Sequence, residues 1–342
     1  MIRPPTTYDG RNLDPRLADP RGEGAGIEVS RPETAWPAPT EAQEPTTAPA
    51  ETYTETYYDL PVVKPPPWKW YVAAYFYGSG LGGAAATAAA AAELAGQHQL
   101  ARRLHRVAAI SEAAGAACLI ADLGRPTRFH HMMRVFRPSS PMNVGVWILS
   151  AASASSGLAV LGDLRGRRGL GVAGAVGAIA GALLSTYTGV LIGNTAIPIW
   201  AATRRRMPAW FAAEAAASLA SLDELLAPAR GERLPRSYHV AAKAAALIGA
   251  RSVETGAAAA GVARPLRDGR AGQMWRGATW LAAGSLIATL ARRPRLAGVL
   301  GTVAALAVRF ALIEAGRASA ADPRATFGPQ RRIDRPASRP PG

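Results

Sequence analysis

The sequence has 342 residues, a formal net charge of +15 and a mean hydropathy of only +0.04. Its one cysteine, Cys118, cannot by itself form an intrachain disulfide, a zinc finger or an iron–sulfur cluster. The arginines occur in clusters between apolar runs rather than along one helix face, so we expect no nucleic-acid partner.

The N-terminal segment differs from the rest in composition. Residues 1–69 contain seven Lys or Arg and eleven Asp or Glu, whereas the body that follows is basic and rich in alanine. Residues 1–67 consist largely of Pro, Thr, Ala and Glu and cannot bury enough apolar area to offset chain entropy. We therefore expect disordered tails at residues 1–67 and at the basic residues 318–342, and we see no signal-peptide core.

Three long uncharged segments predict a membrane protein. They are Trp70–Ala92, Pro138–Gly162 and Gly169–Thr203, with 23, 25 and 35 residues. About 20 helical residues cross a hydrocarbon core of about 30 Å. The third segment is long enough for one span to about Gly193 and a short interfacial piece, "TAIPIW". Trp68 and Trp70 precede the first segment, as is typical of an interface belt.

Five further segments have the length of a span, and most of them carry charges: Leu104–Leu123, Ala209–Ala227, Val240–Val262, Trp275–Ala291 and Leu296–Ala315. The expected fold is therefore all-α, with eight transmembrane helices arranged as two four-helix bundles over residues 68–317. An even number of spans puts both termini on one side. Small residues at four-residue spacing, Gly78/Gly82 and Gly177/Gly181, predict close helix approaches.

Charged residues inside spans are functional candidates if they face the bundle interior. They are Glu112, Glu214, Asp223, Glu224, Lys243, Arg251, Glu254 and Arg309. Lys243 and Glu254 share one face of their helix, and Arg251 lies one turn from Glu254 and can pair with it. These residues are interpreted either as structural ion pairs or as a proton path through Glu112, Glu224, Lys243, Arg251 and Glu254.

Asp122 ends the second predicted span, in the stretch "CLIADLGRPTRFHHMMRVFRPSSPMNVGVW". The helix dipole disfavours a negative charge there, whereas the nearby Arg125 favours it. Asp122 is thus either a proton-exchanging carboxylate or one half of a local bridge to Arg125. Counting spans places Tyr75, Asp122 and Tyr187 at one depth, on the side of the N-terminus. No inward-facing histidine pair is visible, so we expect neither haem nor metal in this chain.

Three strings carry a resemblance to a known family: "YYDLPVVKPPPWKWYVAAYFYGSGLGG", the Asp122 stretch and "STYTGVLIGNTAIPIW". Together they resemble the NrfD family of polysulfide-reductase-type membrane subunits, over about Tyr57 to Arg206. The last four predicted helices match that family only in number and character.

The resemblance implies a multi-pass, haem-free subunit of the bacterial inner membrane that binds menaquinone or ubiquinone, or the corresponding quinol. It implies a four-cluster ferredoxin-type iron–sulfur partner and a molybdopterin catalytic subunit. Asp122 and Tyr187 match the motif positions beside the quinone, with Arg125 and Tyr75 nearby. Asp122 would act as general base, and Arg128, Arg134 and Arg137 would dock the partner. The resemblance thus implies a non-autonomous, quinone-reactive subunit of an oxidoreductase complex.

Two other function classes fit the same sequence. One is a polytopic transporter or proton-translocating subunit that uses the charged residues of the sixth helix. The other is a purely structural membrane anchor in which the site is vestigial. A quinone-dependent reductase activity favours the redox subunit, whereas solute uptake without a redox partner favours the transporter.

Overall fold

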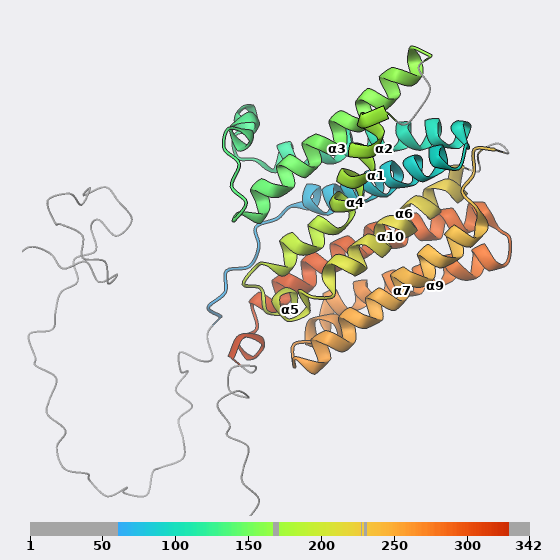
Figure 1. Ribbon diagram of the computed structural model, residues 1–342. Coiled ribbons are helices and arrows are strands. Elements are labelled where there is room, and N and C mark those ends of the chain that lie inside the picture. The colour runs from blue at the N-terminus through green and yellow to red at the C-terminus, as the bar shows by residue number, and fades with distance from the viewer. Residues whose placement is uncertain (1–60, 167–170, 227, 229–230, 328–342) are drawn as a thin grey trace, which may run out of the picture. The chain divides into compact units, whose positions relative to one another are not determined.

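The computed structural model describes residues 61–166, 171–226, 228 and 231–327, and within these ranges it contains helices and no strand (Figure 1). The all-helical expectation is therefore confirmed there. The predicted tails fall mainly on residues 1–60 and 328–342, which lie outside the described residues. The last helix continues to Ala320, beyond the tail boundary expected at residue 317.

Long helices occur at each of the eight predicted positions. They are α1 (Trp70–Leu94), α2 (His98–Asp122), α3 (Pro141–Leu164), α4 (Gly171–Gly193), α6 (Met207–Leu226), α7 (Arg236–Ala259), α9 (Gly269–Leu290) and α10 (Pro294–Ala320). The short elements between them are η2 (Pro126–Met133), α5 (Pro198–Thr203) and α8 (Arg264–Arg267).

Four of the described helices are long and apolar enough to cross a membrane, judged by length and composition: α2, α3, α10 and residues Gly174–Gly193 of α4. The chain is thus a membrane protein with several apolar helices. The remaining long helices differ in composition: α1 consists mainly of Ala and Gly, whereas α6, α7 and α9 carry charged residues.

Glycines set the closest helix approaches. Helix α1 packs on α2 and α4, α3 packs on α4, and α6 and α9 both pack on α10. A Cβ added to Gly83 of α1 would lie 2.5 Å from the carbonyl oxygen of Gly181 in α4. One added to Gly82 would lie 2.5 Å from Cγ of Glu112 in α2. The predicted role of the small residues is confirmed at Gly82 and Gly181.

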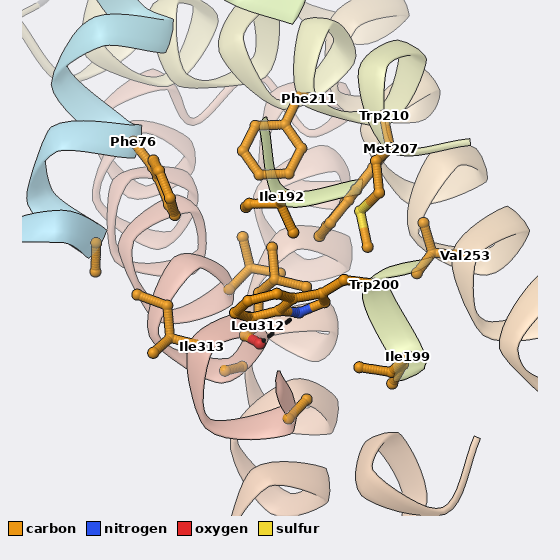
Figure 2. Close-up of a cluster of buried hydrophobic side chains, with 14 of the residues drawn as sticks. Phe76, Ile192, Ile199, Trp200, Met207, Trp210, Phe211, Val253, Leu312 and Ile313 are labelled. Atoms are coloured by element: carbon orange, nitrogen blue, oxygen red, sulfur yellow. Dashed lines mark hydrogen bonds between the residues drawn. The ribbon is translucent and has the colours of Figure 1, made fainter. Parts of the chain in front are cut away.

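The main hydrophobic core surrounds α5 (Figure 2). Trp200 is fully buried, donates a hydrogen bond from Nε1 to the carbonyl of Leu312 (3.2 Å) and stacks on Trp68 with ring centroids 5.2 Å apart. Gly316 of α10 leaves room for its ring. The piece expected to be interfacial is thus a helix whose tryptophan is buried, because α10 offers a small residue opposite it. Trp70, in contrast, is exposed, as the interface prediction requires.

Candidate functional site

The connection between α2 and α3 begins at Asp122 and returns to the helices at Pro141. Leu123 is extended and ends α2, and Pro126 is the first residue of η2, where a proline is tolerated because that N–H has no helical partner. At the other end, Ser140 caps α3 by accepting a hydrogen bond from the amide of Asn143 (3.4 Å). Residues 123–140 therefore form a loop with defined start and end.

Asn143 fastens this loop to α3. Its side-chain amide donates to the carbonyls of Met132 (2.9 Å) and Val135 (3.0 Å), and its Oδ1 accepts from the backbone N–H of Arg137 (2.7 Å). One side chain thus satisfies three backbone groups of a loop that has little regular structure. No sequence pattern singled out Asn143, because an amide near a helix start more often serves that helix than a distant loop.

Tyr187 reaches the same place from α4. Its hydroxyl donates to the carbonyl oxygen of Pro141, the first residue of α3. Its ring lies against Gly145, where an added Cβ would overlap the ring atoms. Tyr75 of α1 is also buried and lies close enough to interact electrostatically with Tyr187. The structure therefore brings the two predicted tyrosines together at the start of α3.

Asp122 lies at this end of the helices too, because the loop that begins after it ends at Pro141. Its side chain is half-buried, and within the described ranges it forms neither an ion pair with Arg125 nor a hydrogen bond to Tyr75 or Tyr187. The alternative interpretation, a local bridge that shapes the turn, is not realised. Arg125 is exposed.

Around this end the loop presents positive charge and apolar side chains. Arg128, Arg134 and Arg137 are exposed, and none pairs with an acid in the part of the chain that the structure describes. Phe129 and Phe136 are 40% and 57% exposed. We call these five residues the loop surface. Such a combination of unpaired arginines and exposed aromatic side chains is typical of a protein-binding surface.

A second polar region lies at the opposite end of the helices, where α6 leads into α7. Asp223 of α6 accepts hydrogen bonds from Arg103 of α2, from Nε2 of His239 (2.9 Å) and from the amide of Leu234 (3.3 Å). Asp223 is 2% exposed, so its charge depends on these partners for stabilisation. The sequence identified Asp223 as a candidate but not Arg103 or His239, because they come from other helices.

Glu224 is the centre of the neighbouring network. It pairs with Lys243 of α7 and accepts a hydrogen bond from Thr289 of α9 (2.8 Å), while Lys243 also donates to Thr289 (3.0 Å). A cavity of about 30 Å³ between α6, α7, α9 and α10 is lined by Lys243 and Glu214 together with Ser221. That volume holds about one or two water molecules.

Three other predicted charges are buried without a direct ion pair among the described residues. Glu112 is fully buried, and its carboxylate faces the hydroxyl of Ser156 in α3 rather than a cation among the described residues. Arg309 lies 4.4 Å from the ring centroid of Phe211, and its Nε and Nη1 atoms have no hydrogen-bond partner. Glu214 interacts with Arg309 only at longer range. Buried polar groups of this kind are costly and point to function or to ordered water.

The expected pair between Arg251 and Glu254 forms, at 2.9 Å, but not in the interior. The Arg251 side chain is 74% exposed, whereas Glu254 also accepts a hydrogen bond from Nε1 of Trp275 (2.6 Å). The predicted polar stripe along one helix is therefore divided: Lys243 faces the interior and Arg251 faces outward. No group of three or more metal-ligating side chains occurs in the described ranges.

Comparison with known families supports the resemblance over part of the chain. Residues 59–162 match the family described as Polysulphide reductase, NrfD. No curated protein matches the chain. The matched range contains Tyr75, Glu112, Asp122 and the loop surface, whereas Tyr187, Asp223 and Glu224 lie beyond it.

Proposed function

We propose that this chain, an NrfD-family membrane subunit, reacts with quinone or quinol in the bilayer and exchanges electrons with an iron–sulfur partner of an oxidoreductase complex. One observation carries the proposal. The hydroxyl of Tyr187 donates a hydrogen bond to the carbonyl of Pro141. Pro141 lies inside the family-matched range and directly follows the arginine-rich loop that begins after Asp122. Residues from α1, α2 and α4 thereby share one end of the helices.

The architecture that goes with this function is eight membrane spans in two groups of four. In this proposal α1 to α4 make up the first group, and α6, α7, α9 and α10 make up the second; the packing of α1 on α2 and α4 and of α10 on α6 and α9 supports it. Each of these helices has at least 20 residues, the length needed to cross a bilayer of about 30 Å. The acids and bases of α6 and α7 are mainly paired inside the second group, which reduces the cost of placing them in lipid.

The side chains at the site have complementary chemical roles. Oxidation of a bound quinol releases two electrons and two protons, so the site requires hydrogen-bond and proton acceptors. Tyr187 donates its own proton to Pro141, and its oxygen therefore keeps lone pairs that accept a hydrogen bond. Asp122 is half-buried and forms no ion pair with any residue that the structure describes, so it is available as general base and as a route for the proton to the loop. Arg125 and Tyr75 complete the proposed binding site.

The loop surface would dock the electron partner. Three unpaired arginines attract an acidic iron–sulfur subunit and orient it over the quinone site, while the exposed phenylalanines supply apolar contact. A four-cluster ferredoxin-type subunit, with a molybdopterin catalytic subunit behind it, is the partner set that the NrfD resemblance implies. The soluble substrate belongs to that catalytic subunit.

Proton translocation is a second candidate function, favoured by the buried groups away from the quinone site. A proton path would use the buried residues Glu112, Glu224 and Lys243, with Glu254 at one end. Arg251, which the sequence also suggested, does not contribute to an interior path because its side chain faces outward. In vesicles that hold the complex, quinol-driven acidification that is abolished by Glu112→Gln and Glu224→Gln would support it. Unchanged acidification in both variants would contradict it.

The direct test of the quinone site uses Asp122→Asn and Tyr187→Phe in the assembled complex. We expect quinol-dependent reduction of the partner's clusters to fall by about 10²-fold or more for Asp122→Asn, the range typical of a lost general base. Asp163→Asn, a half-buried aspartate at the other end of α3, and Tyr71→Phe are the matched controls and should retain activity. If Asp122→Asn assembles normally and turns over quinol as fast as Asp163→Asn, the proposal is wrong.

A further inference from the structure

A groove beside α1, α4 and α6 is not used by the proposed function. It has a volume of about 590 Å³ and lies toward the end of the helices where α6 joins α7. Its walls are mainly alanines, including Ala88 and Ala91 of α1, Ala182 of α4 and Ala216 of α6. We call it the alanine groove. The small alanine side chains leave this space open between the larger residues of its lining, among them Leu100 and Tyr238.

The hydroxyl groups that line the alanine groove are already engaged. Thr87 donates to the carbonyl of Gly83 (3.0 Å), Ser185 to that of Gly181 (3.0 Å), and Tyr238 contacts the carbonyl of Ala216 (3.5 Å). Thr186 of the lining likewise donates to the carbonyl of Leu183 (2.9 Å). Apart from the amide of Gln97, the groove's lining therefore suits an apolar occupant. In a bilayer, an empty groove of this size would forfeit dispersion contacts along its walls, so a hydrocarbon chain is the natural occupant.

The mouth of the groove adjoins a basic pocket. Leu234 lines both the groove and a second pocket of about 260 Å³, whose lining includes Arg233, Arg236 and Arg292. The two concavities are thus neighbours that share one residue. One is apolar and lies along the helices, and the other is charged and lies at their ends.

The pocket carries net positive charge even though Asp223 and Glu224 form part of its wall. Both carboxylates are already paired with cations from the interior, Asp223 with Arg103 and Glu224 with Lys243. His239, which also lies against the pocket, contacts Asp223 at 2.9 Å and Glu224 at 3.8 Å. The arginines at the rim are therefore not needed to neutralise these acids.

Two of those arginines are placed to receive an anion. Arg236 uses one nitrogen to donate to the carbonyl of Leu290 (2.8 Å), and it forms no ion pair within the described ranges. Arg292 forms no side-chain hydrogen bond or ion pair there either. Its backbone φ is +58°, a conformation that usually requires glycine after a helix end. An arginine in this backbone conformation is strained, and residues held in such strain cluster at functional sites. The strain therefore supports a functional role for the Arg292 charge at the pocket.

We propose that the pocket and the alanine groove together bind one anionic phospholipid, with its phosphate on Arg236 and Arg292 and an acyl chain in the groove. The positive charge of the pocket favours an anionic head group, and the apolar walls of the alanine groove favour an acyl chain attached to that head group. Basic pockets at the ends of membrane helices bind anionic head groups in this way. A free phosphate would use only the first half of this site, and a neutral lipid only the second.

The test measures lipid adducts on the purified full-length chain by native mass spectrometry, with phosphatidylglycerol and phosphatidylcholine of identical chains. We expect preferential retention of phosphatidylglycerol. The double variant Arg236→Gln/Arg292→Gln should bind this lipid about thirtyfold more weakly, since each arginine near the membrane surface raises the affinity for an anionic lipid about fivefold. Arg102→Gln/Arg106→Gln, which removes two exposed arginines of α2 outside the pocket, should retain the lipid.

A second pair of measurements tests the acyl-chain half. Ala88→Phe and Ala91→Phe fill the groove from α1, and Ala91 is exposed, so its substitution does not threaten packing. We expect both variants to lose phosphatidylglycerol, whereas inorganic phosphate should not displace it from the wild type. Equal retention of the two lipids, retention by the Arg236/Arg292 variant, indifference to groove filling, or displacement by phosphate alone would each overturn the proposal.

Discussion

The ring of Tyr187 lies directly against the backbone of Gly145, so that a Cβ at position 145 would overlap it. The same tyrosine donates its hydroxyl proton to the carbonyl of Pro141, one helical turn earlier in α3. Gly145 thus determines where the phenol lies. Gly145 therefore controls the position of the phenol group that we propose lies beside the quinone.

Gly145→Ala should displace the Tyr187 ring and break its bond to Pro141. We expect a loss of about 1–3 kcal/mol in the free energy of unfolding, as for other overpacked cores, together with a loss of quinol-dependent activity. Thermal unfolding in detergent and reduction of the partner's clusters measure the two effects.

The double variant Gly145→Ala/Tyr187→Ser separates packing from chemistry. Serine leaves room for the added methyl group, so Gly145→Ala should cost no further stability in the Tyr187→Ser background, while activity stays low. Recovery of activity in the double variant would mean that Tyr187 has only a packing role.

Asn143→Ala should release the loop that ends at α3. The side chain makes hydrogen bonds to Met132, Val135 and Arg137, and each such bond contributes about 0.5–1.5 kcal/mol. We therefore expect faster tryptic cleavage after Arg128 and Arg134 and faster amide hydrogen exchange across residues 126–137.

Asn194→Ala is the matched control, because the Asn194 amide donates only within its own helix, to Val190 (2.8 Å). It should leave cleavage of the loop unchanged. Equal protection of the loop in both variants would show that Asn143 does not hold it.

Reversal of charge on the loop surface should weaken docking of the iron–sulfur subunit. With Arg128, Arg134 and Arg137 all changed to Glu, we expect the subunit to dissociate from detergent-solubilised complex at low salt, whereas the wild type should release it only at high salt. Iron content and the cluster spectrum of the co-purified complex report the outcome.

The control for this experiment is Arg102→Glu/Arg106→Glu. These arginines are exposed on α2 at the other end of the helices, so they change the net charge without touching the loop. If both sets of substitutions release the partner equally, the loop surface is not the docking site.

Lys243→Met should be strongly destabilising, because it leaves Glu224 charged and buried with the Thr289 hydrogen bond and a longer contact to His239 (3.8 Å). Removal of one member of a buried ion pair typically costs about 3–5 kcal/mol. Adding Glu224→Gln should recover much of that loss, and a double-mutant cycle of thermal unfolding measures the coupling.

Arg251→Ala provides the comparison on the same helix. That arginine is 74% exposed, and an exposed pair contributes about 0–1 kcal/mol. A loss of stability as large as that of Lys243→Met would contradict the division of α7 into an inward and an outward charged face.

The positions of the helices could be predicted from the sequence, and so could part of the site. Uncharged runs such as Pro138–Gly162 are long enough to span a bilayer, and Pro126 cannot continue α2, so both features are local consequences of chain chemistry. The pairing of Arg251 with Glu254 was also predictable, since residues three apart on one helix are neighbours.

The partners of the other charges depend on tertiary structure. Arg103 and Asp223 are 120 positions apart, and Lys243 pairs with Glu224 of α6 rather than with a residue of its own helix. Helical periodicity tells which residues share a face, but not which helix lies opposite that face or at what rotation. The inward direction of Lys243 and the outward direction of Arg251 follow from that packing alone.

Some features of the proposed quinone site follow from the sequence, and others follow only from the tertiary structure. Its residue types and their common depth follow from motifs and from the number of spans, which the order of apolar segments along the chain determines. The contact between Tyr187 and Pro141 arises only when α3 and α4 are packed against each other. A hydrogen bond is short-ranged and directional, so it depends on a precise approach of two helices that composition and spacing do not specify.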